Sequence, residues 1–127
     1  MIAYLLVFLG AGIGGAMRHG VNTGCARWCG LDFPWGTLTV NIAGSLLMGL
    51  IAGWLAFKAG ENWTQHTRLF LTTGILGGFT TFSAFSLDAM LLWERGQLMI
   101  ASTYVLGSVI LSIAALALGL ALVRALT

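Results

Sequence analysis

The sequence predicts an all-α membrane protein with four transmembrane helices per chain, the third of which is broken. Of the 127 residues, 58% are hydrophobic and only 8% are charged, a balance that is not typical of a water-soluble domain. Four apolar stretches, at about residues 2–19, 35–57, 69–92 and 98–123, are close to the roughly 20 residues that a membrane-spanning helix needs. Glycines cluster in the middle of the third stretch, where they weaken a helix. We therefore expect one four-helix transmembrane domain over residues 1–127.

The first stretch predicts a helix that packs closely against a neighbour. Gly10 and Gly14 form a small-xxx-small pair. No basic segment precedes the apolar residues, so we expect a structural helix rather than a cleaved signal. The connection 20–34 reads as a surface loop or a short helix. Its Cys25 and Cys29 would share a helix face, but no third or fourth ligand is near in sequence, which disfavours a metal site.

The second stretch carries one polar stripe on an apolar helix. Pro34 suits the start of this helix, and Thr37, Asn41 and Ser45 follow at a spacing of four residues. An amide at membrane depth is costly unless it has a partner or water. Asn41 therefore either joins helices by a hydrogen bond or lines a polar path, and both interpretations stay open.

The third stretch breaks its own helix between Gly74 and Phe85. Three glycines and two threonines occur there, and unwound backbone at this depth persists only inside protein or beside a polar cavity. Phe82 and Phe85 would share one helix face, either for function or for packing and lipid contact. Asp88 is the acid of this stretch, either functional or placed in a watery vestibule.

The fourth stretch repeats the polar pattern with Tyr104, Ser108 and Ser112. The inward groups are then rich in hydrogen-bond donors and poor in carboxylates, which suits an anion. Phenyl rings present a positive edge that can also face an anion. Neutral donors make the weak, repeated sites that conduction requires.

The charges say little about orientation but exclude some functions. Three basic residues fall on each side of the predicted membrane, so the positive-inside rule does not decide the topology. Either other features set the topology, or the chain inserts both ways and pairs with its inverted copy. The net charge of +2 gives no reason to expect nucleic-acid binding. No catalytic group of nucleophile, base and orienting residue can be assembled, so no enzyme is predicted.

Three motifs together resemble one family. They are Gly14-Gly15-Ala16-Met17-Arg18, Pro34-Trp35-Gly36-Thr37-Leu38-Thr39-Val40-Asn41 and Gly77-Gly78-Phe79-Thr80-Thr81-Phe82-Ser83-Ala84-Phe85. In this order they resemble the fluoride channels known as the Fluc or CrcB family, over essentially the whole chain. The resemblance implies a dual-topology antiparallel homodimer with two fluoride pores, each drawing residues from both subunits.

The resemblance also implies residue roles. The expected fluoride-pore residues are Asn41, Thr81, Phe82, Ser83, Phe85, Tyr104, Ser108 and Ser112. Arg18 matches the family's arginine near the pore entrance. A structural Na⁺ at the centre of the dimer interface would be held by the backbone carbonyls of Gly77 and Thr80. Ala84 and Asp88 depart from the family's common Thr and Glu, which affects the expected ion route.

The implied function is passive fluoride export across the plasma (inner) membrane. Fluoride that enters as neutral HF dissociates in the cytoplasm, and a channel lets the trapped anion leave, which reduces fluoride toxicity. The alternative is a small dual-topology multidrug exporter, which would need a membrane-embedded carboxylate to couple protons to drugs. A further alternative is an assembly subunit without transport.

Overall fold

The computed structural model describes residues 1–30, 33–57 and 66–126. All of its regular structure is helical, and four helices are long and apolar enough to cross a membrane: Ile2–Cys29, Trp35–Trp54, His66–Glu94 and Leu98–Leu126. The predicted all-α class, four spans and bent third span are therefore confirmed. Most of the predicted connection after the second span lies outside the described residues.

Helix α1 (Ile2–Cys29) is longer than predicted. The sequence interpretation ended it near residue 19 and expected a loop or a short helix from residue 20. No proline interrupts residues 20–29, so the helix continues even though it leaves the apolar stretch. It ends at Gly30, whose φ of 84° places it in the left-handed region that favours glycine.

Helix α2 (Trp35–Phe57) has the predicted bounds. Pro34 stands just before it, and the amide of Leu38 donates to the Pro34 carbonyl at 3.2 Å. The fixed φ of proline suits this first turn, and its missing N–H is not needed there.

The third span consists of η1 (Leu69–Leu76), α4 (Gly77–Phe79) and α5 (Phe82–Glu94). The first of these is a π-helix, a wider form than the α-helix. A tight turn follows α5 at Arg95 and Gly96, and Gly96 has a φ of 79°. Helix α6 (Leu98–Leu126) then returns across the bundle.

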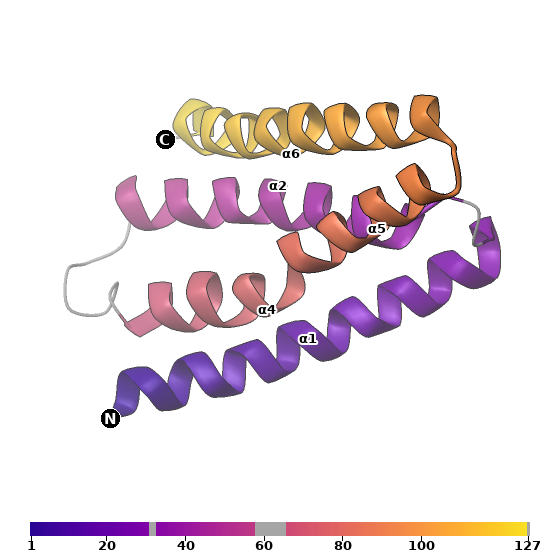
Figure 1. The fold of residues 1–127 in the computed structure, drawn as a ribbon. Coiled ribbons are helices and arrows are strands. Elements are labelled where there is room, and N and C mark those ends of the chain that lie inside the picture. The colour runs from indigo at the N-terminus through magenta and orange to yellow at the C-terminus, as the bar shows by residue number, and fades with distance from the viewer. Residues whose placement is uncertain (31–32, 58–65, 127) are drawn as a thin grey trace.

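Figure 1 shows α1 beside η1 and α4 on one side of the bundle, and α6 beside α2 on the other. Helix α5 crosses from the first side toward α6. The close approach of α1 depends on Gly14, because a Cβ there would overlap the carbonyl oxygen of Ile75 and lie 2.7 Å from the Phe79 amide nitrogen. Small residues thus hold the two short pieces η1 and α4 against the longer α1.

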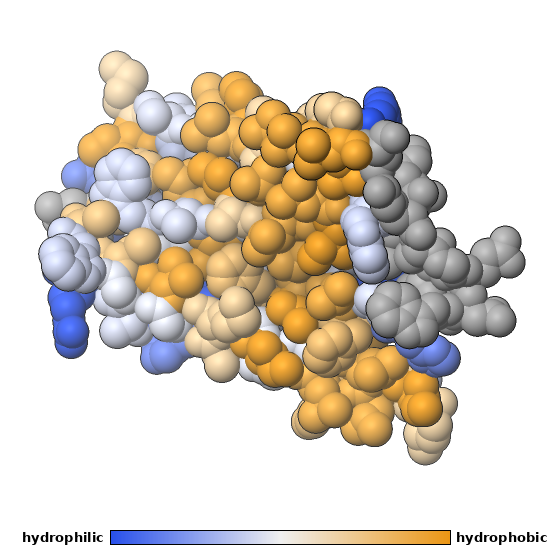
Figure 2. All heavy atoms as spheres, turned by 180° about the vertical axis from the view of Figure 1, so that it is seen from behind, coloured by the Kyte–Doolittle hydropathy of each residue, from blue (hydrophilic) through white to orange (hydrophobic). Residues whose placement is uncertain are grey.

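The outer surface is broadly apolar. Seen from behind, hydrophobic residues cover the middle of the molecule, and strongly hydrophilic residues lie toward its ends (Figure 2). The buried core is small, with Phe85, Leu92, Ala101 and Tyr104 as its main cluster. The chain therefore leaves wide helix faces for lipid or for another protein surface.

Candidate functional site

The break in the third span is two residues long. Thr80 (φ −83°, ψ 158°) and Thr81 (φ −153°, ψ 124°) are extended, between the end of α4 and the start of α5. Thr81 caps α5, because its Oγ1 accepts a hydrogen bond from the Ala84 amide at 3.1 Å. The glycines before the break and this threonine cap after it explain why the helix stops here and begins again.

Asn41 holds the break from α2. Its Nδ2 donates to the Thr81 carbonyl at 3.1 Å, and its Oδ1 accepts from the Thr81 amide at 2.9 Å. One side-chain amide thus satisfies both backbone groups of an unwound residue, as a neighbouring strand would. The Asn41 side chain has two N–H groups, so one remains beyond this pair of bonds.

These bonds divert two amides from their usual helical acceptors. In a continuous helix the Thr81 amide would donate to Gly77 and the Ala84 amide to Thr80. Here they donate to Asn41 Oδ1 and Thr81 Oγ1 instead. The carbonyls of Gly77 and Thr80 have therefore lost their helical donors.

A cavity of about 390 Å³ lies beside the break. We call it the break cavity; α2, the third span and α6 all contribute to its wall. Its polar lining residues are Asn41, Ser45, Thr80, Thr81, Ser108 and Ser112. Phe82 and Phe85 line it as well, and none of the described lining residues carries a charge. Six of the eight predicted fluoride-pore residues are thus brought together around one cavity: Asn41, Thr81, Phe82, Phe85, Ser108 and Ser112.

Ser108 has an unused hydroxyl in this cavity. The residue is 4% exposed, and its Oγ has no hydrogen-bond partner in the part of the chain that the structure describes. Buried hydroxyls normally have partners. The orphaned Oγ of Ser108 therefore marks a place where a polar guest would be stabilised.

The aromatic residues connect the break cavity with α6. The rings of Phe82 and Phe85 lie 5.6 Å apart, and that of Phe85 lies 5.2 Å from the ring of Tyr104. Phe85 and Tyr104 are 8% and 1% exposed, whereas Phe82 is 77% exposed. The two phenylalanines therefore share a helix face as predicted, but within one chain only Phe85 is enclosed.

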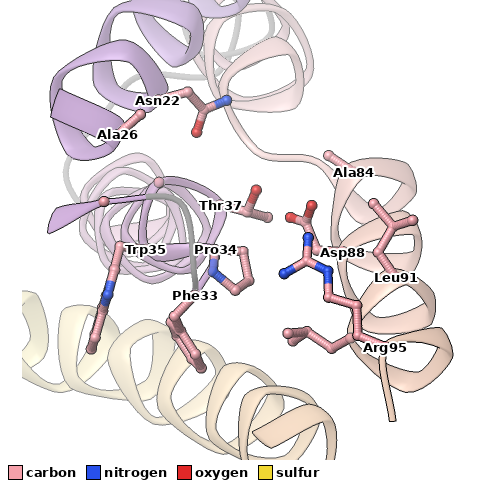
Figure 3. Close-up of a pocket in the computed structure, with 13 residues that line it drawn as sticks. Asn22, Ala26, Phe33, Pro34, Trp35, Thr37, Ala84, Asp88, Leu91 and Arg95 are labelled. Atoms are coloured by element: carbon pink, nitrogen blue, oxygen red, sulfur yellow. The ribbon is translucent and has the colours of Figure 1, made fainter. Parts of the chain in front are cut away.

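A second cavity, of about 290 Å³, lies where α1 and α5 end and α2 begins. We call it the mouth cavity; its polar lining includes Asn22, Thr37, Asp88 and Arg95. Figure 3 shows Asp88 pointing from α5 toward Thr37, and Arg95, just after the end of α5, reaching toward Asp88. Tyr104 donates its hydroxyl hydrogen bond to Asp88 Oδ2 at 3.3 Å, so the Phe85–Tyr104 contact links the two cavities.

The remaining predicted residues lie outside these linings. Arg18 is half-buried on α1, about three turns before the helix ends, and lines neither cavity. Ser83 is exposed, and its Oγ lies 3.3 Å from Thr81 Oγ1. Cys25 and Cys29 are free thiols on α1, and no cluster of three or more metal-ligating side chains occurs among the described residues.

Sequence reasoning gave no site role to several of the polar lining residues, among them Thr37, Ser45 and Arg95. Ser45 and Thr37 belong to the α2 stripe that the spacing of four residues revealed, one turn on either side of Asn41. Arg95 had no such signal, because it lies in the turn after α5 and belongs to no polar stripe. It reaches the mouth cavity because it is the helical C-cap of α5, seven residues after Asp88, which continues the helix face that Asp88 occupies.

Known proteins resemble this chain along nearly its whole length. Residues 5–120 match the family described as CrcB-like protein, Camphor Resistance (CrcB). A protein of Rhodopseudomonas palustris (strain BisB5) named "Fluoride-specific ion channel FluC" is 61% identical over 126 residues, which cover 99% of this chain and 100% of the relative. Another so named, of Methylobacterium nodulans, is 59% identical over 124 residues, covering 98% of each chain. "Fluoride-specific ion channel FluC 2" of Nitrobacter hamburgensis is 56% identical with the same coverage. With these matches, and with a broken third span beside an uncharged polar cavity, the chain belongs to the CrcB family.

Proposed function

We propose that this protein is a fluoride-selective passive channel that lets cytoplasmic fluoride leave the cell and so reduces fluoride toxicity. One observation carries the proposal beyond family membership. The break cavity offers neutral donors from α2, the third span and α6, with no charge in its lining. The protein is a multi-pass protein of the plasma membrane, which is the inner membrane in bacteria.

The chemistry of the cavity suits a small, strongly hydrated anion. The remaining Asn41 N–H and the hydroxyls of Ser108 and Ser112 can donate to fluoride in place of water. A buried Lys or Arg would bind the anion more deeply and slow its release, whereas neutral donors allow it to leave. Phe82 and Phe85 add ring edges, which carry partial positive charge.

We propose further that two copies assemble as an antiparallel homodimer with two pores. The exposed ring of Phe82 supports this, because a second copy would cover an aromatic side chain that already borders the cavity. The broad apolar faces supply surface for such contact. The even distribution of basic residues permits insertion in both orientations.

A structural Na⁺ at the dimer centre fits the same break. Its proposed ligands are the backbone carbonyls of Gly77 and Thr80, whose helical donors are diverted to Asn41 and Thr81. Carbonyl oxygens suit a hard cation, and two copies would contribute four of them. When bound, the cation would supply positive charge that holds the two breaks together.

The test is fluoride efflux from liposomes that contain the purified protein, read with a fluoride electrode and with chloride as the control ion. Rapid release of fluoride without chloride is expected. Comparable chloride release, or no fluoride release from folded protein, would refute the channel. An exporter would need a membrane-embedded carboxylate, and the described lining of the break cavity includes none. Uptake of a cationic drug driven by a pH gradient would distinguish the exporter from the channel.

A further inference from the structure

We propose that Asp88 and Arg95 form an opposed pair of charges that sets the electrostatic potential of the mouth cavity, and that Arg95 thereby keeps this cavity open to an anion. The inference rests on the proposed channel function. It concerns how fluoride reaches the break cavity, whose described lining residues are all uncharged.

The composition of the mouth cavity carries the first step. Among the described residues that line it, Asp88 and Arg95 are the charged ones, and the other polar groups are neutral. Both side chains lie in the lining of the cavity, so both of their charges act on its interior. A volume of about 290 Å³ corresponds to roughly ten water molecules at about 30 Å³ each, so a hydrated anion fits.

Asp88 places a negative charge where an anion would have to pass. Its Oδ2 accepts a hydrogen bond from the buried Tyr104 hydroxyl, which keeps the carboxylate at the inner wall of the cavity. Tyr104 in turn packs against Phe85, which lines the break cavity. An anion passing from the mouth cavity to the break cavity therefore passes an acid that repels it.

Arg95 lies where its positive charge can offset the negative charge of Asp88. Arg95 is the C-cap of α5 and keeps helical backbone angles, so it lies two helical turns after Asp88 on the same side. Helical side chains lean toward the helix N-terminus. Figure 3 accordingly shows the guanidinium extending back toward Asp88 within the cavity. Arg95 is thus placed to cancel the repulsion from Asp88 on the side from which the anion arrives.

Four variants test the pair by the initial rate of fluoride efflux at low fluoride, where the rate follows entry into the path. Arg95→Gln should slow efflux by about 3- to 10-fold at low salt, since charge at a cleft changes association rates by such factors or more. Asp88→Asn keeps an oxygen acceptor for Tyr104 and should raise the rate. The double variant should return close to the wild-type rate. Arg95→Lys preserves the charge and should behave like the wild type.

Salt dependence and a matched control separate electrostatics from structure. The effect of Arg95→Gln should shrink toward none as potassium gluconate raises the ionic strength from about 10 mM to about 1 M, because the screening length falls from about 30 Å to about 3 Å. Arg27→Gln removes an exposed charge from the last turn of α1, beside the cavity but outside its lining. It should have a clearly smaller effect.

Three results would overturn the inference. They are an equal loss in Arg27→Gln, a salt-independent loss in Arg95→Gln, or changes of the same direction in Arg95→Gln and Asp88→Asn. Thermal unfolding of each variant identifies protein that has failed to fold, and the Arg95→Lys comparison then decides the case. If the wild type itself releases no fluoride, the proposed function fails, which is a different outcome from a functioning channel that ignores these charges.

Discussion

Replacing Gly14 with alanine should loosen the contact between α1 and the broken third span. The new Cβ would overlap the Ile75 carbonyl oxygen and lie 2.7 Å from the Phe79 amide nitrogen, whereas ordinary contacts begin at 3.4 Å. To bring the contact with the Phe79 nitrogen from 2.7 Å to 3.4 Å, α1 must withdraw by at least about 0.7 Å, and the overlap with the Ile75 oxygen requires more. Both obstacles are backbone atoms, so no side chain can rotate away to relieve the overlap.

Gly15→Ala is the matched control, because nothing lies within 4 Å of a Cβ at that position. Alanine raises helix propensity by about 1 kcal/mol relative to glycine in both variants, so this gain cancels in the comparison. Overpacking of this kind costs about 1–3 kcal/mol. Gly14→Ala should therefore be less stable than Gly15→Ala by that amount, or roughly 5- to 150-fold in the ratio of folded to unfolded protein.

The assay is the unfolding equilibrium of both variants in the same detergent or lipid, with fluoride efflux measured alongside. Gly14→Ala should lose both stability and efflux, because the break cavity depends on the placement of the third span. If Gly14→Ala proves as stable as Gly15→Ala, α1 does not hold the third span at this contact, and the reasoning is wrong.

Four further outcomes are expected. Asn41→Ala should abolish most efflux and lower the free energy of unfolding by about 1–3 kcal/mol, since the Thr81 amide and carbonyl lose their partners. An unchanged free energy of unfolding would contradict the role of Asn41 at the break. Ser108→Ala should lower efflux on the order of tenfold without loss of stability, because its Oγ has no partner among the described residues, while Thr103→Ala on the exposed face of α6 should keep normal efflux. Gly96→Ala should lower the unfolding midpoint by forcing alanine to a φ of 79°, and Gly107→Ala, with no neighbour within 4 Å, should not. Replacing sodium with choline should lower the midpoint if the proposed Na⁺ site exists, and equal midpoints would argue against it.

The sequence predicts the break more accurately than it predicts its surroundings. Gly77 and Gly78 disfavour the helix locally, and Thr81 is a good cap, so the interruption depends on neighbours in sequence. The end of α1 and the π-helical form of η1 were missed, because residues 20–29 contain no strong helix stop and π-helices have no clear sequence signature.

For the site too, residue spacing predicts which side chains share a helix face but not which partners they bind. The spacing of Asn41, Ser108 and Ser112 places each on a helix face, and the structure brings those faces around one cavity. Spacing does not reveal that Asn41 uses its amide on Thr81, or that Phe82 faces outward while Phe85 is enclosed. The lining of the mouth cavity by Arg95 depends on where α1 and α5 end, which only the packed structure specifies.

The break also places a helix dipole inside the membrane. Helix α5 has 13 residues and is about 20 Å long at 1.5 Å per residue, which is less than the roughly 30 Å of hydrocarbon. Its N-terminus therefore begins within the bilayer, at Thr81 and Phe82, two residues that line the break cavity. That end carries a partial charge of roughly +0.5, and in a medium of low dielectric its field reaches further than it would in water. The described lining of this cavity includes no lysine or arginine, yet the end of α5 presents positive potential there, and it does so with backbone N–H groups instead of a charged side chain.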